Sequence, residues 1–138
     1  MEKLWANLHG GSTHFPIALM IASVIFDGLA YLINRDPIKR DLHAAGFYAL
    51  LLGAAATLVA TLSGLAISAW QFFGEGILAK HHDFVWPAFG LMIGLAVWRV
   101  VVRGEATRTA FGIYLVVAGL TAGLMAAAGY FGGELLGS

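Results

Sequence analysis

The chain has 138 residues, of which 59% are hydrophobic and 12% are charged, and its mean hydropathy is +0.80. This composition is far more apolar than that of a soluble domain and predicts an integral membrane protein. Eight Lys and Arg balance eight Asp and Glu, which leaves no net basic field to hold nucleic acid. The absence of cysteine excludes disulfides, thiolate metal sites, iron–sulfur clusters and covalent haem attachment, so His, Asp and Glu are the remaining candidate ligands.

Four apolar segments are long enough to cross a membrane, because about 20 helical residues span about 30 Å of hydrocarbon. They lie at about 14–34, 42–71, 84–103 and 109–133. Asp27 is the only charge in the first segment, and the third is complete only if Arg99 extends its charged end outward. Because the connections are short, we expect one all-α domain over residues 1–138, a four-helix transmembrane bundle with up-down-up-down topology.

The first span is expected to be retained rather than cleaved as a signal peptide. Polar residues and glycines between Asn7 and Ser12 interrupt the apolar core that such a peptide needs. Ser12 or Thr13 is expected to cap a helix that begins beside His14, and Pro16 falls in its first turn, where a missing N–H costs little.

Positive charges gather at one end of the predicted bundle. Six of them flank the first and third connections, whereas two lie at the other end: Arg35, Lys39, Arg40, Arg99, Arg103 and Arg108 against Lys3 and Lys80. Since Lys and Arg are retained on the cytoplasmic side, we expect a bacterial inner-membrane protein with both termini in the periplasm. Tyr114 is expected in an aromatic belt at the inner interface.

Small residues indicate where the helices approach closely. The second span has Ala56, Ala60, Gly64 and Ser68 at intervals of four, the third has Gly90 and Gly94, and the fourth has Gly119 and Gly123. We interpret these positions as packing within the bundle rather than as dimerisation motifs.

Four of the five histidines are expected at the periplasmic end. His9 and His14 precede the first span, and His81 and His82 precede the third, which runs in the same direction. His14 and the His81–His82 pair should therefore face each other at similar depth. A b-type haem in a helical bundle needs two imidazoles at matched depth, so one hypothesis is axial ligation by His14 and by His82 or His81, with His82 slightly preferred.

Two other interpretations of these histidines remain open. Interfacial imidazoles commonly hydrogen-bond to water and lipid headgroups without further function. Alternatively, His9, His14, His81 and His82 bind zinc or copper together with nearby carboxylates, since both metals accept such ligands. His9 and His14 lie about 140° apart on a helix, so they share one ion only if the Gly10–Gly11 pair redirects the chain.

Asp27 is expected to face the bundle interior, because a carboxylate inside a span costs roughly 2.5–3.5 kcal/mol. His43, at the cytoplasmic end of the next span, is a candidate partner. One interpretation makes Asp27 a proton relay or part of a quinone pocket, and the other makes it a structural polar clamp between helices.

Two motifs stand near the ends of the chain: an N-terminal H-x4-HFPIAL motif from His9 to Leu19 and a C-terminal G-Y-x-G-G-E-L motif from Gly129 to Leu135. With Phe26-Asp27 and Thr61–Leu65, they make the chain resemble a family of four-helix bacterial membrane proteins of unknown function. Members of that family occur alone or joined to cytochrome c-like modules, which implies a redox role. Members often continue into a tail with another histidine, whereas this chain ends Leu136-Gly137-Ser138, so the resemblance assigns Glu134 less weight.

Together these observations favour a small subunit of a bacterial respiratory or photosynthetic electron-transfer complex. It would bind haem b near the periplasmic face and relay electrons between quinone and a periplasmic partner such as a cytochrome, without being an enzyme by itself. The alternative is a cofactor-free structural or assembly subunit that packs against other membrane subunits. Periplasmic copper or zinc binding is the third hypothesis.

Overall fold

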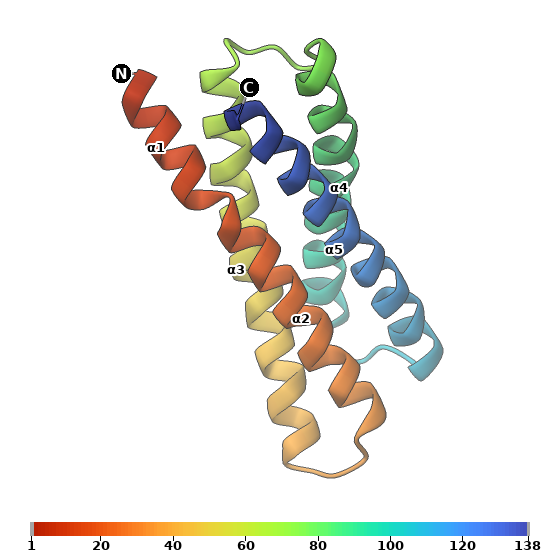
Figure 1. The fold of residues 1–138 in the computed structure, drawn as a ribbon. Helices are drawn as coiled ribbons and strands as arrows, with labels where there is room; N and C mark the ends of the chain where they lie inside the picture. The colour runs from red at the N-terminus through yellow and green to blue at the C-terminus, as the bar shows by residue number, and fades with distance from the viewer. Residues whose placement is uncertain (1, 138) are drawn as a thin grey trace.

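The computed structural model describes residues 2–137 and forms an elongated helical bundle (Figure 1). Its helices are α1 (Glu2–Ser12), α2 (His14–Leu32), α3 (Ile38–Ile67), α4 (Gly76–Val102) and α5 (Arg108–Gly137). Four segments are long and apolar enough to cross a membrane: Lys3–Leu32, Ile38–Ile67, Gly76–Val102 and Arg108–Leu135. The predicted all-α fold with four transmembrane helices is thereby confirmed.

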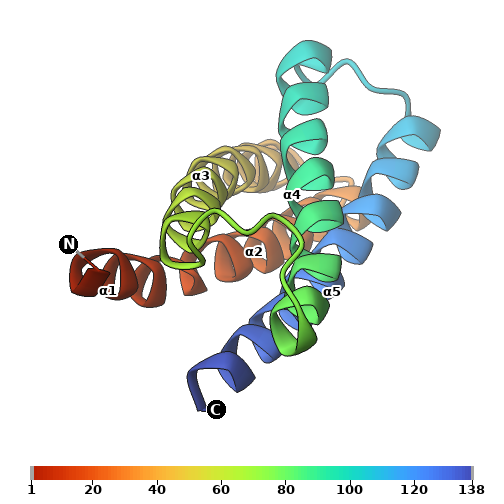
Figure 2. The same cartoon turned by 90° about the horizontal axis from the view of Figure 1, so that it is seen from above.

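Each helix packs against its neighbours in the chain, and α5 closes the bundle by packing on α2. The order around the bundle is therefore α2, α3, α4, α5, which gives the expected up-down-up-down topology. Both termini lie at the end that carries the α3–α4 connection, and the other two connections lie at the opposite end (Figure 1). Seen from above, the α2–α3 and α4–α5 hairpins are inclined to each other (Figure 2).

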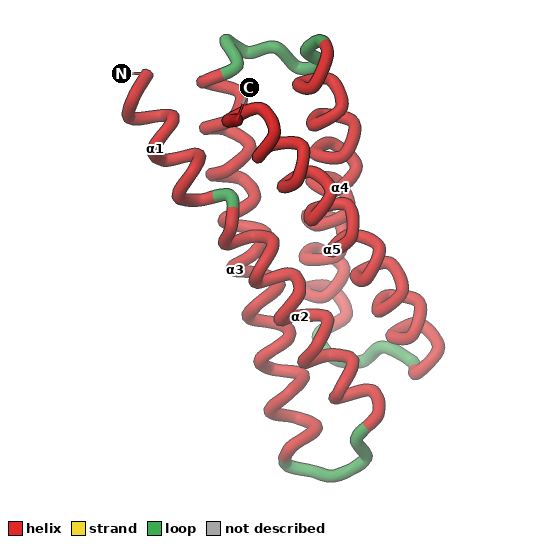
Figure 3. The backbone as a smooth tube through the Cα atoms, in the orientation of Figure 1, coloured by secondary structure: helices red, strands yellow, loops and turns green. Residues whose placement is uncertain are grey.

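The first span begins earlier than the sequence predicts. Only a short break at Thr13 separates α1 from α2 (Figure 3), and Thr13 itself has helical φ and ψ of −64° and −28° with no side-chain cap. Ser12 Oγ donates to the carbonyl of His9, and Thr13 Oγ1 donates to that of Gly10. Because these hydroxyls bond back to the preceding turn, they continue the helix instead of starting one. The helix α2 does begin at His14 as expected, but the expected side-chain cap by Ser12 or Thr13 is absent.

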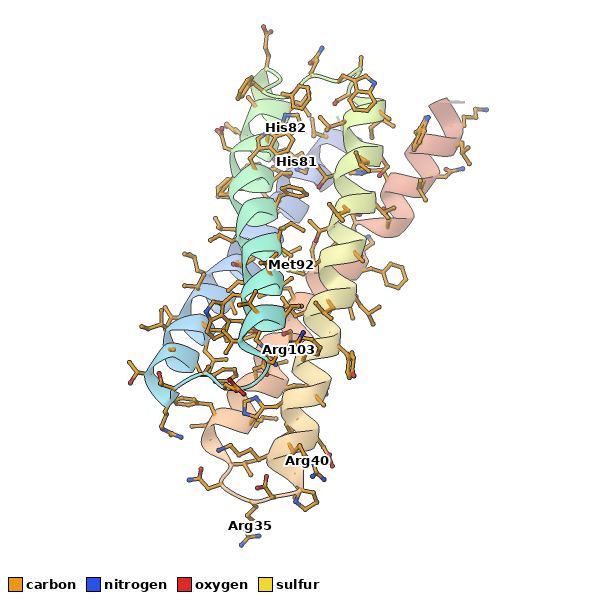
Figure 4. The ribbon with its side chains drawn as sticks, turned by 180° about the vertical axis from the view of Figure 1, so that it is seen from behind. Arg35, Arg40, His81, His82, Met92 and Arg103 are labelled. Carbon is orange, nitrogen blue, oxygen red and sulfur yellow. The ribbon has the colours of Figure 1, made fainter. Side chains whose placement is uncertain are left out.

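The middle of the bundle is apolar, and its two ends are polar. Met20, Leu50 and Met92 are fully buried at the centre, from three different helices. Figure 4 shows His81 and His82 at one end of the bundle, and Arg35, Arg40 and Arg103 at the other, with Met92 between them. The apolar centre thus separates a histidine-containing end from an arginine-rich end.

Glycine packing follows the prediction at Gly64 but not at the other four positions. A Cβ atom on Gly64 would lie 2.9 Å from His9 Cε1, so this glycine receives a side chain from α1. A Cβ on Gly90, Gly94, Gly119 or Gly123 would meet no atom of a neighbouring element within 4 Å. These four glycines lie on exposed faces of α4 and α5, whereas the same helices bury other small residues such as Ala88 and Ala118. The expected role of the four glycines in packing within the bundle is not what the structure shows.

Candidate functional site

A partly open pocket lies at the histidine-containing end of the bundle and is lined by residues from all five helices. Its cavity volume is about 100 Å³, which is smaller than the roughly 300–1,000 Å³ that small-molecule and cofactor sites occupy. Three imidazoles line it, from His9, His81 and His82. The remaining lining is largely apolar and includes Ile17, Leu65, Val85, Trp86, Phe89 and Met125.

His9 and His81 are oriented in the same way. His9 Nδ1 lies 3.0 Å from the carbonyl oxygen of Ala60 in α3, and His81 Nδ1 lies 2.8 Å from that of Ala128 in α5. A carbonyl only accepts, so Nδ1 carries the proton in each ring and Nε2 keeps its lone pair. An imidazole whose Nδ1–H is held by a carbonyl, with Nε2 free, is the arrangement that ligating histidines commonly adopt.

Small residues make room for both rings. His9 Nδ1 also lies 3.2 Å from Ser63 Oγ, and His9 packs over Gly64. A Cβ on Gly132 would lie 3.2 Å from His81 Cε1. The small-residue positions on α3 and α5 therefore determine where the two imidazoles lie.

His82 is more deeply buried than the other two, with an exposed fraction of 7%. Its ring lies beside Trp86, with centroids 6.1 Å apart, and its Nδ1 has no hydrogen-bond partner among the described residues. The structure also corrects the boundary of this segment, because α4 begins at Gly76 and the histidine pair lies inside the helix rather than before it. The third predicted span thus gains two turns at its N-terminus.

His14 does not reach this pocket. It is exposed at the start of α2 and is not among the residues that line the cavity. Because the chain stays helical from His9 to His14, the two side chains diverge by about 140°, so that His9 faces α3 and His14 faces outward. The expectation that His14 faces the His81–His82 pair is therefore corrected: His9 occupies that position.

Residues 2–137 contain no group of three or more His, Cys, Asp or Glu side chains that could hold a metal ion. The three histidines share one pocket, but they do not converge with a carboxylate as the hypothesis of a zinc or copper site requires.

A second polar centre lies near the arginine-rich end. Asp27 is fully buried, as expected, and its Oδ2 accepts hydrogen bonds from Arg99 Nη1 and, at 2.8 Å, from Tyr114 Oη. Arg99 Nη2 also donates to the carbonyl of His43 at 3.1 Å. His43 Nδ1 lies 3.6 Å from Asp27 Oδ1. His43, which the sequence indicates as a candidate partner of Asp27, is therefore its neighbour.

All four long helices contribute to this centre. The Asp27–Arg99 ion pair joins α2 to α4, two helices that make no backbone approach to each other, and Tyr114 comes from α5. On α3, Gly46 leaves the space that the carboxylate fills, since a Cβ there would lie 2.4 Å from Asp27 Oδ1. The guanidinium also lies 5.4 Å from the ring centroid of Phe111, within the range of cation–π attraction.

Two sequence-based expectations fail at this centre. Arg99 does not extend outward, because its side chain is 8% exposed and points to Asp27. Tyr114 is not an interfacial belt residue, because it is 4% exposed and donates to the same carboxylate. One feature of the sequence could have predicted the Asp27–Arg99 pair. Each is a lone charge near the same end of one of two parallel spans, and a lone charge inside a span needs a buried partner.

Four apolar helices around a buried ion pair define an integral membrane bundle. Residues 6–137 match the family model described as "predicted membrane protein (DUF2231)", so the chain belongs to this family. No match was found among curated proteins or among solved structures.

Proposed function

We propose that this protein is a membrane redox subunit that holds one b-type haem in the pocket lined by His9, His81 and His82. The observation that carries the proposal is the matched orientation of His9 and His81, each with Nδ1 anchored on a backbone carbonyl of another helix. These two rings present Nε2 lone pairs from α1 and α4. They replace the His14–His82 pair that the sequence favours.

The chemistry of the pocket lining suits a flat, largely apolar group, and the cavity of about 100 Å³ would have to widen to admit one. Its lining combines aliphatic and aromatic side chains with few polar atoms, and Gly129 borders it. Apolar walls would exclude water and hold a macrocycle by contact, while His9 and His81 would hold its iron. A haem held in this way would supply one-electron chemistry, which suits electron transfer rather than substrate chemistry.

The distribution of Lys and Arg supports a periplasmic position for this pocket in the bacterial inner membrane. A periplasmic cytochrome could approach there, and quinone from the membrane would be the other redox partner. The buried Asp27 serves either as a polar clamp or as a proton relay, and its hydrogen bonds from Arg99 and Tyr114 favour the clamp.

The test is a visible spectrum of the full chain, purified from haem-replete membranes and compared before and after dithionite reduction. We expect a Soret band and a reduced α-band that are lost in His9→Ala and in His81→Ala. His14→Ala is the matched control and should keep both bands, because His14 is exposed outside the pocket.

Three outcomes separate the alternatives. Loss of the bands in His82→Ala but not in His81→Ala would move the second ligand by one residue. Bands that survive the combined removal of His9, His81 and His82 would place the haem elsewhere. A protein that shows no bands, even after incubation with haemin, would overturn the proposal and favour the cofactor-free structural subunit.

A further inference from the structure

A wide cleft opens at the arginine-rich end, opposite the histidine pocket. It has a volume of about 890 Å³ and is lined by residues of both the α2–α3 and the α4–α5 connections. These two connections lie apart from each other (Figures 1 and 2). Arg40 and Arg103, from α3 and from the end of α4, both lie at this end in Figure 4. The histidine pocket and the proposed haem play no part in it.

The cleft is lined by positive charges that lack carboxylate partners. Lys39, Arg40, Arg103 and Arg108 line it, against Asp36 as the one acidic residue of the lining. Within residues 2–137, none of these four cations forms an ion pair. Arg108 is held over the ring of Tyr31, with the guanidinium carbon 4.1 Å from the centroid. Arg99 and His43 border the cleft from inside, but the Arg99 charge is matched by Asp27.

The walls of the same cleft are apolar and aromatic. Phe47, Tyr48 and Trp98 line it, and Tyr48 is 62% exposed. A site for a free inorganic anion needs cations and N–H donors but gains nothing from aromatic walls. Cations beside exposed aromatic surface, at the end of a membrane-spanning bundle, instead match an amphiphile with an anionic head and an apolar body.

We propose that this cleft binds the headgroup of an anionic phospholipid. Lys39, Arg40 and Arg103 contact the phosphate oxygens, and the wall formed by Phe47, Tyr48 and Trp98 holds the start of an acyl chain. Basic pockets between transmembrane helices on the cytoplasmic side are recognised sites for anionic lipid headgroups in general. The negative phosphate neutralises the unpaired cations of the cleft. The bound lipid also connects the α2–α3 hairpin to the α4–α5 hairpin at the end where their connections lie apart.

The experiment uses the full chain purified in neutral detergent, with native mass spectrometry to measure binding of phosphatidylglycerol and of phosphatidylcholine with identical acyl chains. We expect phosphatidylglycerol to bind more tightly. The double variant Arg40→Gln/Arg103→Gln should weaken that binding by about tenfold or more, since each cation near a lipid headgroup contributes roughly a fivefold factor. Both arginines are exposed, so the substitutions should leave the fold intact.

The matched control is Arg35→Gln. Arg35 is an exposed arginine at the same end of the molecule, but it does not line the cleft, so this variant should bind phosphatidylglycerol like the parent protein. Equal loss in Arg35→Gln would show a general surface-charge effect and overturn the proposal. Equal binding of the two lipids would overturn it as well. Inorganic phosphate that displaces phosphatidylglycerol at micromolar concentration would replace the lipid site with a free-anion site.

Discussion

The buried Asp27 carboxylate is the residue on which the interior of the bundle depends most. An ionised carboxylate in an apolar interior is tolerated only when charge and hydrogen bonds compensate it. Arg99 supplies the opposite charge, and Tyr114 supplies a further donor. Its other oxygen, Oδ1, has no hydrogen bond among the described residues and faces His43 at 3.6 Å.

Breaking this pair should destabilise the protein far more than removing an exposed charge. We expect Arg99→Gln to lower the free energy of unfolding by about 3–5 kcal/mol, because it leaves a buried carboxylate unpaired. Asp27→Asn should cost less than Arg99→Gln, and the double variant should cost less than the sum of the two, since it leaves no lone charge. Unfolding by sodium dodecyl sulfate in mixed micelles measures these values, with Arg35→Gln as the exposed control.

The same variants distinguish the two roles of Asp27. An additive double variant would contradict the ion pair as a stabilising contact. The electron transfer proposed above gives a second measurement. If Asp27→Asn assembles normally but loses this proposed activity, the carboxyl group moves protons, and if the variant keeps it in full, Asp27 is a structural clamp.

At the scale of the helices, glycine positions decide which elements approach closely. Gly46 and Gly53 on α3 lie where a Cβ would meet Asp27 and Met92. The glycine pairs of α4 and α5 have open space beside them. Residues four or seven apart lie on one face of a helix, so the members of each group share a face. The rotation of each helix about its axis then gives the groups different surroundings.

This difference predicts opposite effects of the same substitution at two helical glycines. Gly46→Ala should lower the free energy of unfolding by about 1–3 kcal/mol, because the added methyl group would overlap a carboxylate that is held by two hydrogen bonds. Gly94→Ala should leave stability unchanged or raise it by up to about 1 kcal/mol, since alanine favours a helix and meets no atom there. Thermal unfolding of the two variants in one neutral detergent measures both changes in stability. Equal changes in Gly46→Ala and Gly94→Ala would contradict the close approach of α2 and α3 at Gly46.

The helix α1 shows how one element changes the composition of a site. It extends the first span beyond the predicted start and packs against α3. His9 thereby docks against Ala60, Ser63 and Gly64. The small-residue stripe predicted for helix packing thus receives an imidazole, which the sequence pattern alone did not indicate.

At the scale of the whole molecule, the two polar ends imply an orientation. The arginine-rich end should face the cytoplasm, and the histidine pocket should face the periplasm, because Lys and Arg are retained inside. The chain lacks cysteine, so single cysteines report position without background.

We expect Glu75→Cys, in the α3–α4 connection, to react with a membrane-impermeant maleimide in intact cells. Asp36→Cys, in the α2–α3 connection, should react only after the membrane is disrupted. Both positions are exposed, so reactivity depends on the side of the membrane rather than on burial. The reverse pattern would invert the orientation and move the histidine pocket to the cytoplasmic side.

The sequence by itself determined the class of protein, the number and order of the spans, and the buried position of Asp27. These properties follow from local sums, because the hydropathy of about 20 consecutive residues decides whether a helix can cross a membrane. The cost of an exposed charge in hydrocarbon likewise forces Asp27 inward in any arrangement of the helices.

Only the tertiary structure decided which polar groups meet. The partnership of Arg99 and Tyr114 with Asp27, and the replacement of His14 by His9 in the pocket, depend on how each helix is rotated and inclined in the bundle. A step of one residue turns a side chain by about 100°, so a small change in where a helix begins moves a ligand from the interior to the surface. Long-range packing sets that rotation. The lone charges of Asp27 and Arg99 indicate that each needs a buried partner, but they do not specify how the helices are rotated.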